Sequence, residues 1–458
     1  MTKKTEINAI IVIALPLMAA FLAERGMQFI DSVMMGWLGP TALAAGALGT
    51  ALFFTIIIFC MGVLSAVGVF IVREKGAGTL NNIQSIMQHG LYLAFFLSLP
   101  CMLVLWFTPL MLLKIGEDPV VVADTALLLR GMVWGLPGFL LFLVLREFIA
   151  AFSLTMVVMI VSLISIPLTF AANYVLIYGK YHLPALGIAG IGYGGSVVMW
   201  FMFLCLLLYC KKHLQLKEHL VLSSFQFDRR KFHDMLHIGL PSGALFLVEA
   251  SMFLATSILM GYFGVAALAA HQIAMQCTNI AYAIPIALSI ATAMRVGHEA
   301  GAKDFVKARQ TAVISFSIAF LISVVIVVIF IYQSNFLVSI FLEKGSLDFQ
   351  EVHRLAVLFL NIAAFFLCFD AMQSVANGAL RGLRDTFVPM LFSIGCYWVL
   401  GIGSAYYLSM HTSLGAAGVW YGLVFGLGST AIILMLRFFR KIKRNYSARP
   451  NVSCSNFK

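Results

Sequence analysis

The chain has 458 residues, of which 62% are apolar (Ala, Val, Ile, Leu, Met, Phe, Trp, Tyr or Cys) and only 11% are charged. Its mean hydropathy is +0.98, whereas a soluble globular chain has roughly 45–50% apolar residues and about a quarter charged residues. This excess excludes intrinsic disorder, because disordered chains are poor in apolar residues. It is also too large for the interior of one or two soluble domains. The composition therefore predicts a polytopic membrane protein.

Apolar runs long enough to cross a bilayer occur along the whole chain. A transmembrane helix needs about 20 largely apolar residues, and twelve such runs are present, six in each half of the chain. In chain order they are 10–34, 44–71, 88–111, 121–144, 156–178 and 187–209, followed by 237–260, 268–293, 311–333, 352–376, 388–408 and 415–436. The predicted fold class is therefore all-α, with twelve transmembrane helices.

Lysine and arginine are distributed unevenly among the loops between these runs. With twelve spans both termini lie on one side, and that side carries 24 of the 30 Lys and Arg residues. The opposite loops hold only Lys114, Lys180 and Lys344. Because Lys- and Arg-rich loops stay in the cytoplasm, we expect both termini to be cytoplasmic. The net charge of +11 then faces the anionic lipid of the bilayer, and no nucleic-acid partner is expected.

The sequence contains an internal repeat with an offset of 225 residues. Residues 15–45 align with 240–270 without a gap, and 15 of the 31 positions are identical. A second match aligns 186–194 with 414–422, with six of nine positions identical. Each half holds an even number of spans, so the two copies point the same way and predict two parallel six-helix lobes with a site at their interface. The repeat also argues that the first span belongs to the fold and is not a cleaved leader.

The repeat and the basic segments predict the domain limits. We expect an N-lobe at 1–210, a basic cytoplasmic loop at 211–235, a C-lobe at 236–440 and a basic cytoplasmic tail at 441–458.

Four acidic residues lie inside predicted spans and away from the span ends: Glu24, Asp31, Glu249 and Asp370. A charge at the bilayer centre costs about 2.5–3.5 kcal/mol on insertion scales, so such residues usually face a cavity and serve a function. The alternative is a structural ion pair or a neutral carboxyl, and Glu24 has a candidate partner in its neighbour Arg25. Glu24 and Asp31 are seven residues apart, which predicts that they share a helix face about 10 Å apart. A proton or a monovalent cation could neutralise such carboxylates, as a coupling site requires.

Motifs of the common enzyme classes are absent from the sequence. No Gly-x-x-x-x-Gly-Lys phosphate loop and no His-Glu-x-x-His occurs. The eight cysteines show no metal-ligand spacing and are expected to be reduced and mostly buried. We therefore expect neither enzymatic activity nor a resident cofactor.

Several segments resemble those of one transporter family. They are 29–36 (FIDSVMMG) in the first span, 270–274 (AHQIA) and 295–301 (RVGHEAG) at the two ends of the eighth span, and 378–386 (GALRGLRDT) after the tenth. With Glu249 and Asp370, these segments make the chain similar, over nearly its whole length, to the multidrug and toxic compound extrusion (MATE) family, and specifically to its NorM branch.

The resemblance implies two six-helix lobes around a V-shaped cavity in a bacterial cytoplasmic (inner) membrane, and export of cationic and aromatic drugs by alternating access. It implies a cation site, for Na⁺ or H⁺, at Glu249 and Asp370, with Asp31 acting in the N-lobe. Cavity-lining positions would be Gln272, Phe253, Tyr282, Glu24 and Asn173. The partners would be the small-molecule drug, the monovalent coupling cation and the bilayer, and a monomer is expected.

Three positions depart from the family pattern and leave the coupling ion open between Na⁺ and H⁺. Phe366 stands where relatives often have a tyrosine, Ile177 where some have an acid, and Glu24-Arg25 where a neutral glutamine is more usual.

Two other functions were weighed. A lipid-linked oligosaccharide flippase of related two-lobe design would need a basic cavity for a pyrophosphate, whereas the embedded charges here are mostly acidic. A membrane enzyme acting on lipid would need a clustered nucleophile or a metal set, and the sequence offers neither.

Overall fold

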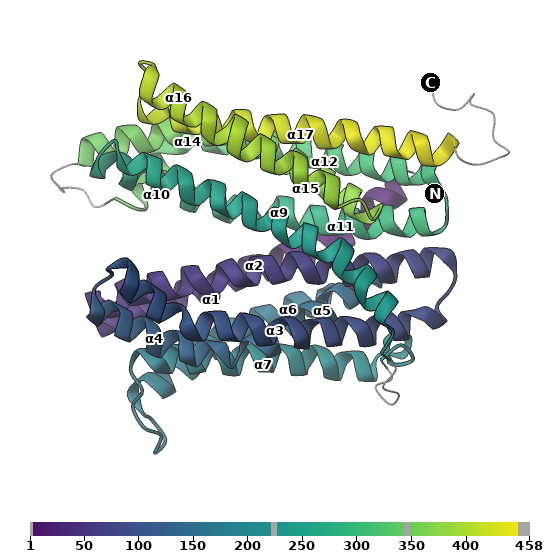
Figure 1. Cartoon of the computed structure of the whole chain (residues 1–458), viewed down its shortest axis with the longest axis horizontal. Coiled ribbons are helices and arrows are strands. Elements are labelled where there is room, and N and C mark those ends of the chain that lie inside the picture. The colour runs from purple at the N-terminus through teal and green to yellow at the C-terminus, as the bar shows by residue number, and fades with distance from the viewer. Residues whose placement is uncertain (1–2, 221–226, 343–348, 448–458) are drawn as a thin grey trace. The chain divides into compact units, whose positions relative to one another are not determined.

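The computed structural model describes residues 3–220, 227–342 and 349–447, and these residues form helices and connecting turns without a β-strand. The helices of the first half are α1 (Lys3–Leu38), α2 (Pro40–Ala77), α3 (Asn81–Ile115), α4 (Pro119–Val133), α5 (Leu136–Ala151), α6 (Met156–Tyr178), α7 (Ile188–Lys212) and the short α8 (Leu214–Lys217). Those of the second half are α9 (Arg229–Gly261), α10 (Val265–Ala281), α11 (Ala283–Gly301), α12 (Phe305–Tyr332), α13 (Ser334–Ser339), α14 (Phe349–Gly382), α15 (Phe387–Ile394), the π-helix η1 (Gly395–Ile402), α16 (Gly403–His411) and α17 (Ala416–Ser447). Figure 1 labels most of them.

The described chain confirms the predicted all-α membrane fold. Eleven helical stretches are each long and apolar enough to cross a membrane, and the pair α4 and α5 forms a twelfth if it is counted as one span bent by 48°. The α10–α11 pair and the α15–η1–α16 series each count as a single stretch. Most of the helices extend beyond the apolar runs from which they were predicted; α9, for example, begins at Arg229, eight residues before the predicted span. In a bilayer every backbone N–H and C=O must be paired within the protein, which explains why these apolar runs are helical.

Local sequence marks where the helices begin and end. Pro40 opens α2 directly after Gly39, whose φ is 117°. Pro119 opens α4, and the side chain of Asp118 accepts a hydrogen bond of 2.8 Å from the backbone N–H of Val120. Proline suits the first turn of a helix because its missing N–H would be unpaired there, and Asp is a favoured N-cap.

The chain divides into two compact units, which we call the N-half unit (Leu15–Gly243) and the C-half unit (residues up to Ala14 together with Ala244 onward). The beginning of α1 therefore belongs to the C-half unit, where Arg295 donates hydrogen bonds of 3.0 and 2.8 Å to Glu6. Thr311 donates a third, of 2.9 Å, to the same carboxylate. The beginning of α9 belongs to the N-half unit, where Lys231 donates a 2.9 Å hydrogen bond to Ser85 on α3. The first helix of each half thus contributes residues to both units.

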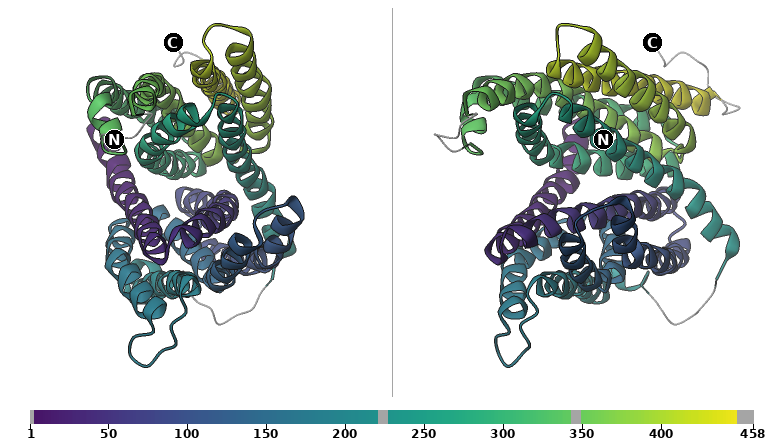
Figure 2. Two further views of the ribbon diagram at one scale, coloured as in Figure 1. Left: turned by 90° about the vertical axis from the view of Figure 1, so that its left-hand side faces the viewer. Right: turned by 60° about the vertical axis from the view of Figure 1, so that its left-hand side comes forward.

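The two copies of the second repeat motif, residues 186–194 and 414–422, lie in similar helix contacts. In the N-half unit α6 and α7 pack together, and in the C-half unit α16 packs on α17 (Figures 1 and 2). Gly190 and its repeat mate Gly418 each lie very close to the neighbouring helix. A Cβ atom added to either glycine would lie within 2.7 Å of the backbone of that helix. An added Cβ on Gly194 would overlap the side chain of Asn173, and one on its mate Gly422 would overlap Ala405. Small residues at such contacts let membrane helices approach closely.

The packing of α7 on α4 can be tested with two glycines of the same helix. A Cβ added to Gly192 would overlap the carbonyl oxygen of Leu128, which is backbone and cannot turn aside, whereas a Cβ on Gly195 would meet nothing within 4 Å. Gly192→Ala should therefore lower the free energy of unfolding by about 1–3 kcal/mol. The control Gly195→Ala should stay within about 0.5 kcal/mol of the original chain. Thermal melting of the detergent-solubilised protein measures both, and equal melting temperatures would contradict the close approach of α4 and α7.

Candidate functional site

Two carboxylates predicted from separate spans meet inside the C-half unit. Glu249 lies in the middle of α9 and Asp370 in the middle of α14, and the two residues are 6% and 2% exposed. The side-chain amide of Gln373 joins them, because its Nε2 donates to Glu249 Oε1 at 3.2 Å and lies 3.4 Å from Asp370 Oδ1. Gln373 stands three residues after Asp370, so both side chains lie on the same face of α14. The pair is thus one site with a shared neutral donor.

Two tyrosines lie around this pair. Tyr397 donates a 3.1 Å hydrogen bond to Oε1 of Gln373 and thereby fixes the amide with its N–H groups toward the carboxylates. Tyr397 belongs to η1, and the wider turn of a π-helix often occurs at functional sites. Tyr282 lies at the break between α10 and α11 and shares a hydrogen bond with Ser374. Both carboxylates are near enough to interact with it electrostatically.

The pair has no basic partner in the part of the chain that the structure describes. No lysine, arginine or histidine nitrogen there lies within 4.0 Å of the Glu249 or Asp370 carboxylate, although eight other ion pairs are present. Residues 3–220, 227–342 and 349–447 also contain no group of three His, Cys, Asp or Glu that could hold a metal ion. Two acids held together without a positive charge can take up a proton or a monovalent cation, since like charges in close contact disfavour each other's ionised form.

Asp31 has a neutral partner in the N-half unit. Asn173 on α6 is fully buried and donates a 2.7 Å hydrogen bond from Nδ2 to Oδ1 of Asp31 on α1. Gly194 on α7 makes room for this asparagine, because any larger residue would overlap its side chain. The structure therefore brings together two of the predicted site residues, Asp31 and Asn173.

Glu24 pairs with Arg146 on α5 and not with Arg25, the partner considered from the sequence. The nearest guanidinium nitrogen of Arg146 lies 3.6 Å from Glu24 Oε1, and another lies 3.8 Å from Glu147. Arg25 instead donates a 3.0 Å hydrogen bond to Gln28. Successive residues on a helix point about 100° apart, so Arg25 is turned away from the carboxylate of Glu24. Arg146, one of the 24 Lys and Arg residues of the predicted cytoplasmic side, is 1% exposed.

A small cavity in the N-half unit lies next to these groups. Its volume is about 50 Å³, and its lining includes Glu24, Gln28 and Asp31 from α1 together with four methionines, Met27, Met132, Met199 and Met202. Since a cavity needs roughly 10–15 Å³ for each water, there is room for a few waters or for small cationic groups. Drug-sized ligands need roughly 300–1,000 Å³.

The remaining predicted site residues, Phe253 and Gln272, lie on α9 and α10. Phe253 on α9 packs edge-on against Phe366 with ring centroids 6.0 Å apart, and Phe366 packs in the same way on Trp420. Phe366 is therefore part of an aromatic cluster. It lies one helical turn before Asp370 and is 2% exposed, so the ring of a tyrosine at this position would also be buried. Gln272 on α10 is exposed, and no hydrogen bond to either carboxylate is recorded for it within the described residues.

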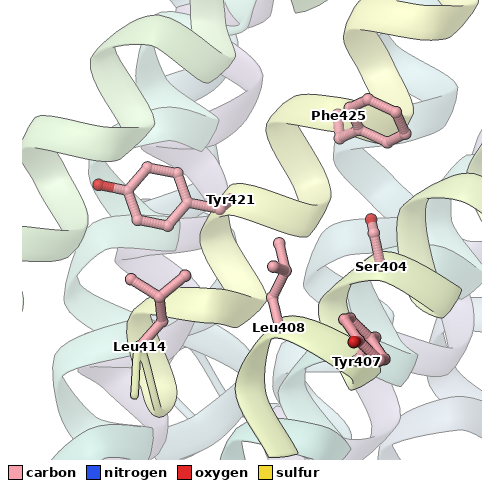
Figure 3. Close-up of a pocket in the computed structure, with 6 residues that line it drawn as sticks. All are labelled: Ser404, Tyr407, Leu408, Leu414, Tyr421 and Phe425. Atoms are coloured by element: carbon pink, nitrogen blue, oxygen red, sulfur yellow. The ribbon is translucent and has the colours of Figure 1, made fainter. Parts of the chain in front are cut away.

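Figure 3 shows a second hollow, on α16 and α17 of the C-half unit. It measures about 520 Å³ and is open, and its lining consists of Ser404, Tyr407, Leu408, Leu414, Tyr421 and Phe425. This lining carries no acidic or basic group. The hollow therefore offers an apolar surface without a site for a cation.

Three residues of these sites were missed from the sequence: Gln373, Tyr397 and Arg146. The spacing from Asp370 could have indicated Gln373, because residues three apart share a helix face. Nothing in the local sequence distinguishes Tyr397 from the other 13 tyrosines, because its direction depends on the π-helix.

Buried acids in a bundle of twelve apolar spans define a multi-pass membrane protein with the organisation of a transporter. Comparison with known proteins identifies the family. A family model described as MatE matches residues 16–175 and 241–407. The chain therefore belongs to the MatE family of transporters, and it is not an enzyme.

Individual relatives agree along nearly the whole chain. The "probable multidrug resistance protein NorM" of Pseudomonas aeruginosa is 37% identical over 96% of this chain and 90% of its own length. The protein of the same name from Pseudomonas putida is 36% identical over 96% of both chains. Among solved structures, a multidrug resistance MATE family transporter of the MOP superfamily in its outward-facing conformation is similar, with a TM-score of 0.86, 21% identity and 96% coverage of both chains. These matches confirm the resemblance to the NorM branch, and the solved structure supports the fold.

The bridge between the two C-half carboxylates can be tested by its removal. Gln373→Leu takes the shared donor away from two buried carboxylates and should lower the free energy of unfolding by about 1–3 kcal/mol. The matched control is Gln276→Leu on α10, because Gln276 is exposed. Melting of the purified protein at neutral pH measures the difference. If Gln373→Leu melted at the same temperature as Gln276→Leu, the bridge would have no energetic role.

Proposed function

We propose that the protein is a cation-coupled antiporter of a bacterial cytoplasmic membrane that exports small cationic and aromatic drugs by alternating access, driven by Na⁺ or H⁺. Its two relatives in Pseudomonas carry the name multidrug resistance protein and are 36–37% identical to it. The observation that carries the coupling is the buried pair Glu249 and Asp370, joined by Gln373 and without a basic partner among the described residues. Both termini are proposed to be cytoplasmic and the protein to act as a monomer.

The chemistry of the pair suits reversible loading of one positive charge. Two buried carboxylates that share a single neutral donor repel each other, and a proton or a Na⁺ ion between them removes this repulsion. The cation would load from the outside and leave toward the cytoplasm, and each elementary charge moved through 100 mV supplies about 2.3 kcal/mol. In the N-half, Asp31 with its partner Asn173 is proposed as a further carboxylate for the coupling ion or the drug. Glu24, Phe253, Gln272 and Tyr282 are proposed to line the drug path.

Neutralising either carboxylate of the C-half pair should abolish coupling. Glu249→Gln and Asp370→Asn each remove the negative charge that the cation needs, so gradient-driven efflux of a cationic dye from proteoliposomes should fall at least tenfold while the protein still inserts. Asp234→Asn is the matched control, because Asp234 is an exposed acid near the start of α9. Gradients of Na⁺ and H⁺ imposed separately identify the coupling ion. Full coupled efflux by both variants would remove the pair from the mechanism.

The proposed cargo can be tested against the flippase alternative by binding. The cavity of the N-half unit is lined by two carboxylates, Glu24 and Asp31, and an anionic pyrophosphate would be repelled there. A cationic dye should therefore bind the purified protein with at least tenfold higher affinity than a soluble analogue of an anionic polyprenyl diphosphate lipid. The opposite order of affinities would favour lipid-carrier transport.

A further inference from the structure

Two carboxylates with different partners line one cavity in the N-half unit. Glu24 and Asp31 lie on the same face of α1, two helical turns and about 10 Å apart along its axis, and both contribute to the cavity lining. The hydrogen bond recorded for Asp31 comes from a neutral amide, that of Asn173. Glu24 faces the guanidinium of Arg146. The two acids of the cavity are therefore not equivalent.

The ion pair between Glu24 and Arg146 is loose. Their closest atoms are 3.6 Å apart, and within the described residues neither Glu24 Oε1 nor any guanidinium nitrogen of Arg146 forms a hydrogen bond although all are buried. A charge-assisted hydrogen bond between such groups would be 2.7–2.9 Å long and is considerably stronger than bare attraction at a greater distance. Oε1 of Glu24 is thus turned toward Arg146 without a hydrogen bond, while the side chain as a whole is 20% exposed and contributes to the cavity lining.

Arg146 has other contacts besides Glu24. Its guanidinium also lies 3.8 Å from Glu147 and sits over the ring of Phe21, with 5.0 Å to the ring centroid. The guanidinium therefore lies between two acids and an aromatic face and does not close on Glu24 alone. This loose contact leaves Glu24 able to attract a second cation from the cavity.

We propose that Glu24 is a specificity-determining residue that gives the transporter a preference for cargo with two positive charges, one bound at Asp31 and the other at Glu24. This inference rests on the proposed function only in taking organic cations as the cargo. A cargo with one charge needs Asp31 alone and leaves the Glu24–Arg146 pair undisturbed. A cargo with two charges places its second cationic group against the part of the Glu24 side chain that lines the cavity.

The rest of the lining suits cationic head groups. Four methionines and the rings of Phe54 and Phe139 surround the two acids. Methionine side chains adapt to ligands of different shape, and aromatic faces attract organic cations. These side chains would contact the cationic groups of the cargo, so the distance between its two charges matters more than its bulk.

The test compares two dyes with the same ring system. Ethidium and propidium share the phenanthridinium ring but carry one and two positive charges, and the fluorescence of each reports equilibrium binding to the purified protein without any ion gradient. Glu24→Gln should weaken propidium binding roughly tenfold and leave ethidium binding within about twofold. Glu117→Gln is the matched control: it removes the same charge at an exposed loop position of the same unit and should change neither affinity. Loss of both dyes to the same extent, or of neither, would overturn the proposal.

A second measurement uses the unaltered protein and so does not depend on the folding of a variant. Bis-quaternary ammonium compounds with increasing spacer length should displace propidium best when their nitrogens are about 10 Å apart, the separation of the two acids along α1. Affinity that does not depend on spacer length would count against two-point binding. If propidium preference depends on Glu24 but no gradient drives efflux, the proposed antiport fails while this inference holds. If efflux is gradient-driven without that preference, the antiport stands and the role of Glu24 is wrong.

Discussion

One requirement governs the structure: each carboxylate that lies away from water must be stabilised by groups of the protein. A buried charge needs either an opposite charge or hydrogen-bond donors, and the four intramembrane acids of this chain meet the requirement in three ways. Glu24 lies beside Arg146, Asp31 accepts a hydrogen bond from Asn173, and Glu249 and Asp370 share the amide of Gln373. Only the first solution supplies a positive charge from the protein itself, and that contact is loose at 3.6 Å; the other three acids depend on a cation from solution for their neutralisation.

Close helix packing places these partners. Asn173 reaches Asp31 because Gly194 on the neighbouring helix has no side chain. Its repeat mate Gly422 brings α17 equally close to α16, although no acid is partnered there. The repeat therefore supplies a common packing scaffold, and each half uses it for different side chains. In the C-half, the wide turn of η1 directs Tyr397 to Gln373 and orients the amide that both carboxylates share.

Family membership explains the helical scaffold. The structure shows which side chains surround Phe366 and Glu24, two residues that the resemblance marks as unusual. Phe366 has no side-chain oxygen to offer the acid pair, and it belongs instead to an aromatic cluster with Phe253 and Trp420. The acid Glu24 is tolerated because Arg146 from α5 lies beside it. The same arginine makes the cavity of the N-half unit chemically different from the acid pair of the C-half unit, which has no basic neighbour among the described residues.

The sequence by itself determined the membrane class, the apolar spans, the repeat and the four acids that lie well inside spans, because hydropathy and charge are local properties and a bilayer permits little besides helices. It also predicted the common face of Glu24 and Asp31, since seven residues make two helical turns. Only the tertiary structure decided the partners. Arg146 is 122 positions from Glu24, and Gln373 is 124 positions from Glu249, so their meeting depends on how helices far apart in the chain pack. The π-helix at Tyr397 likewise arises from packing, whereas the break between α4 and α5 falls at Gly135 and Pro137, a local signal in the sequence.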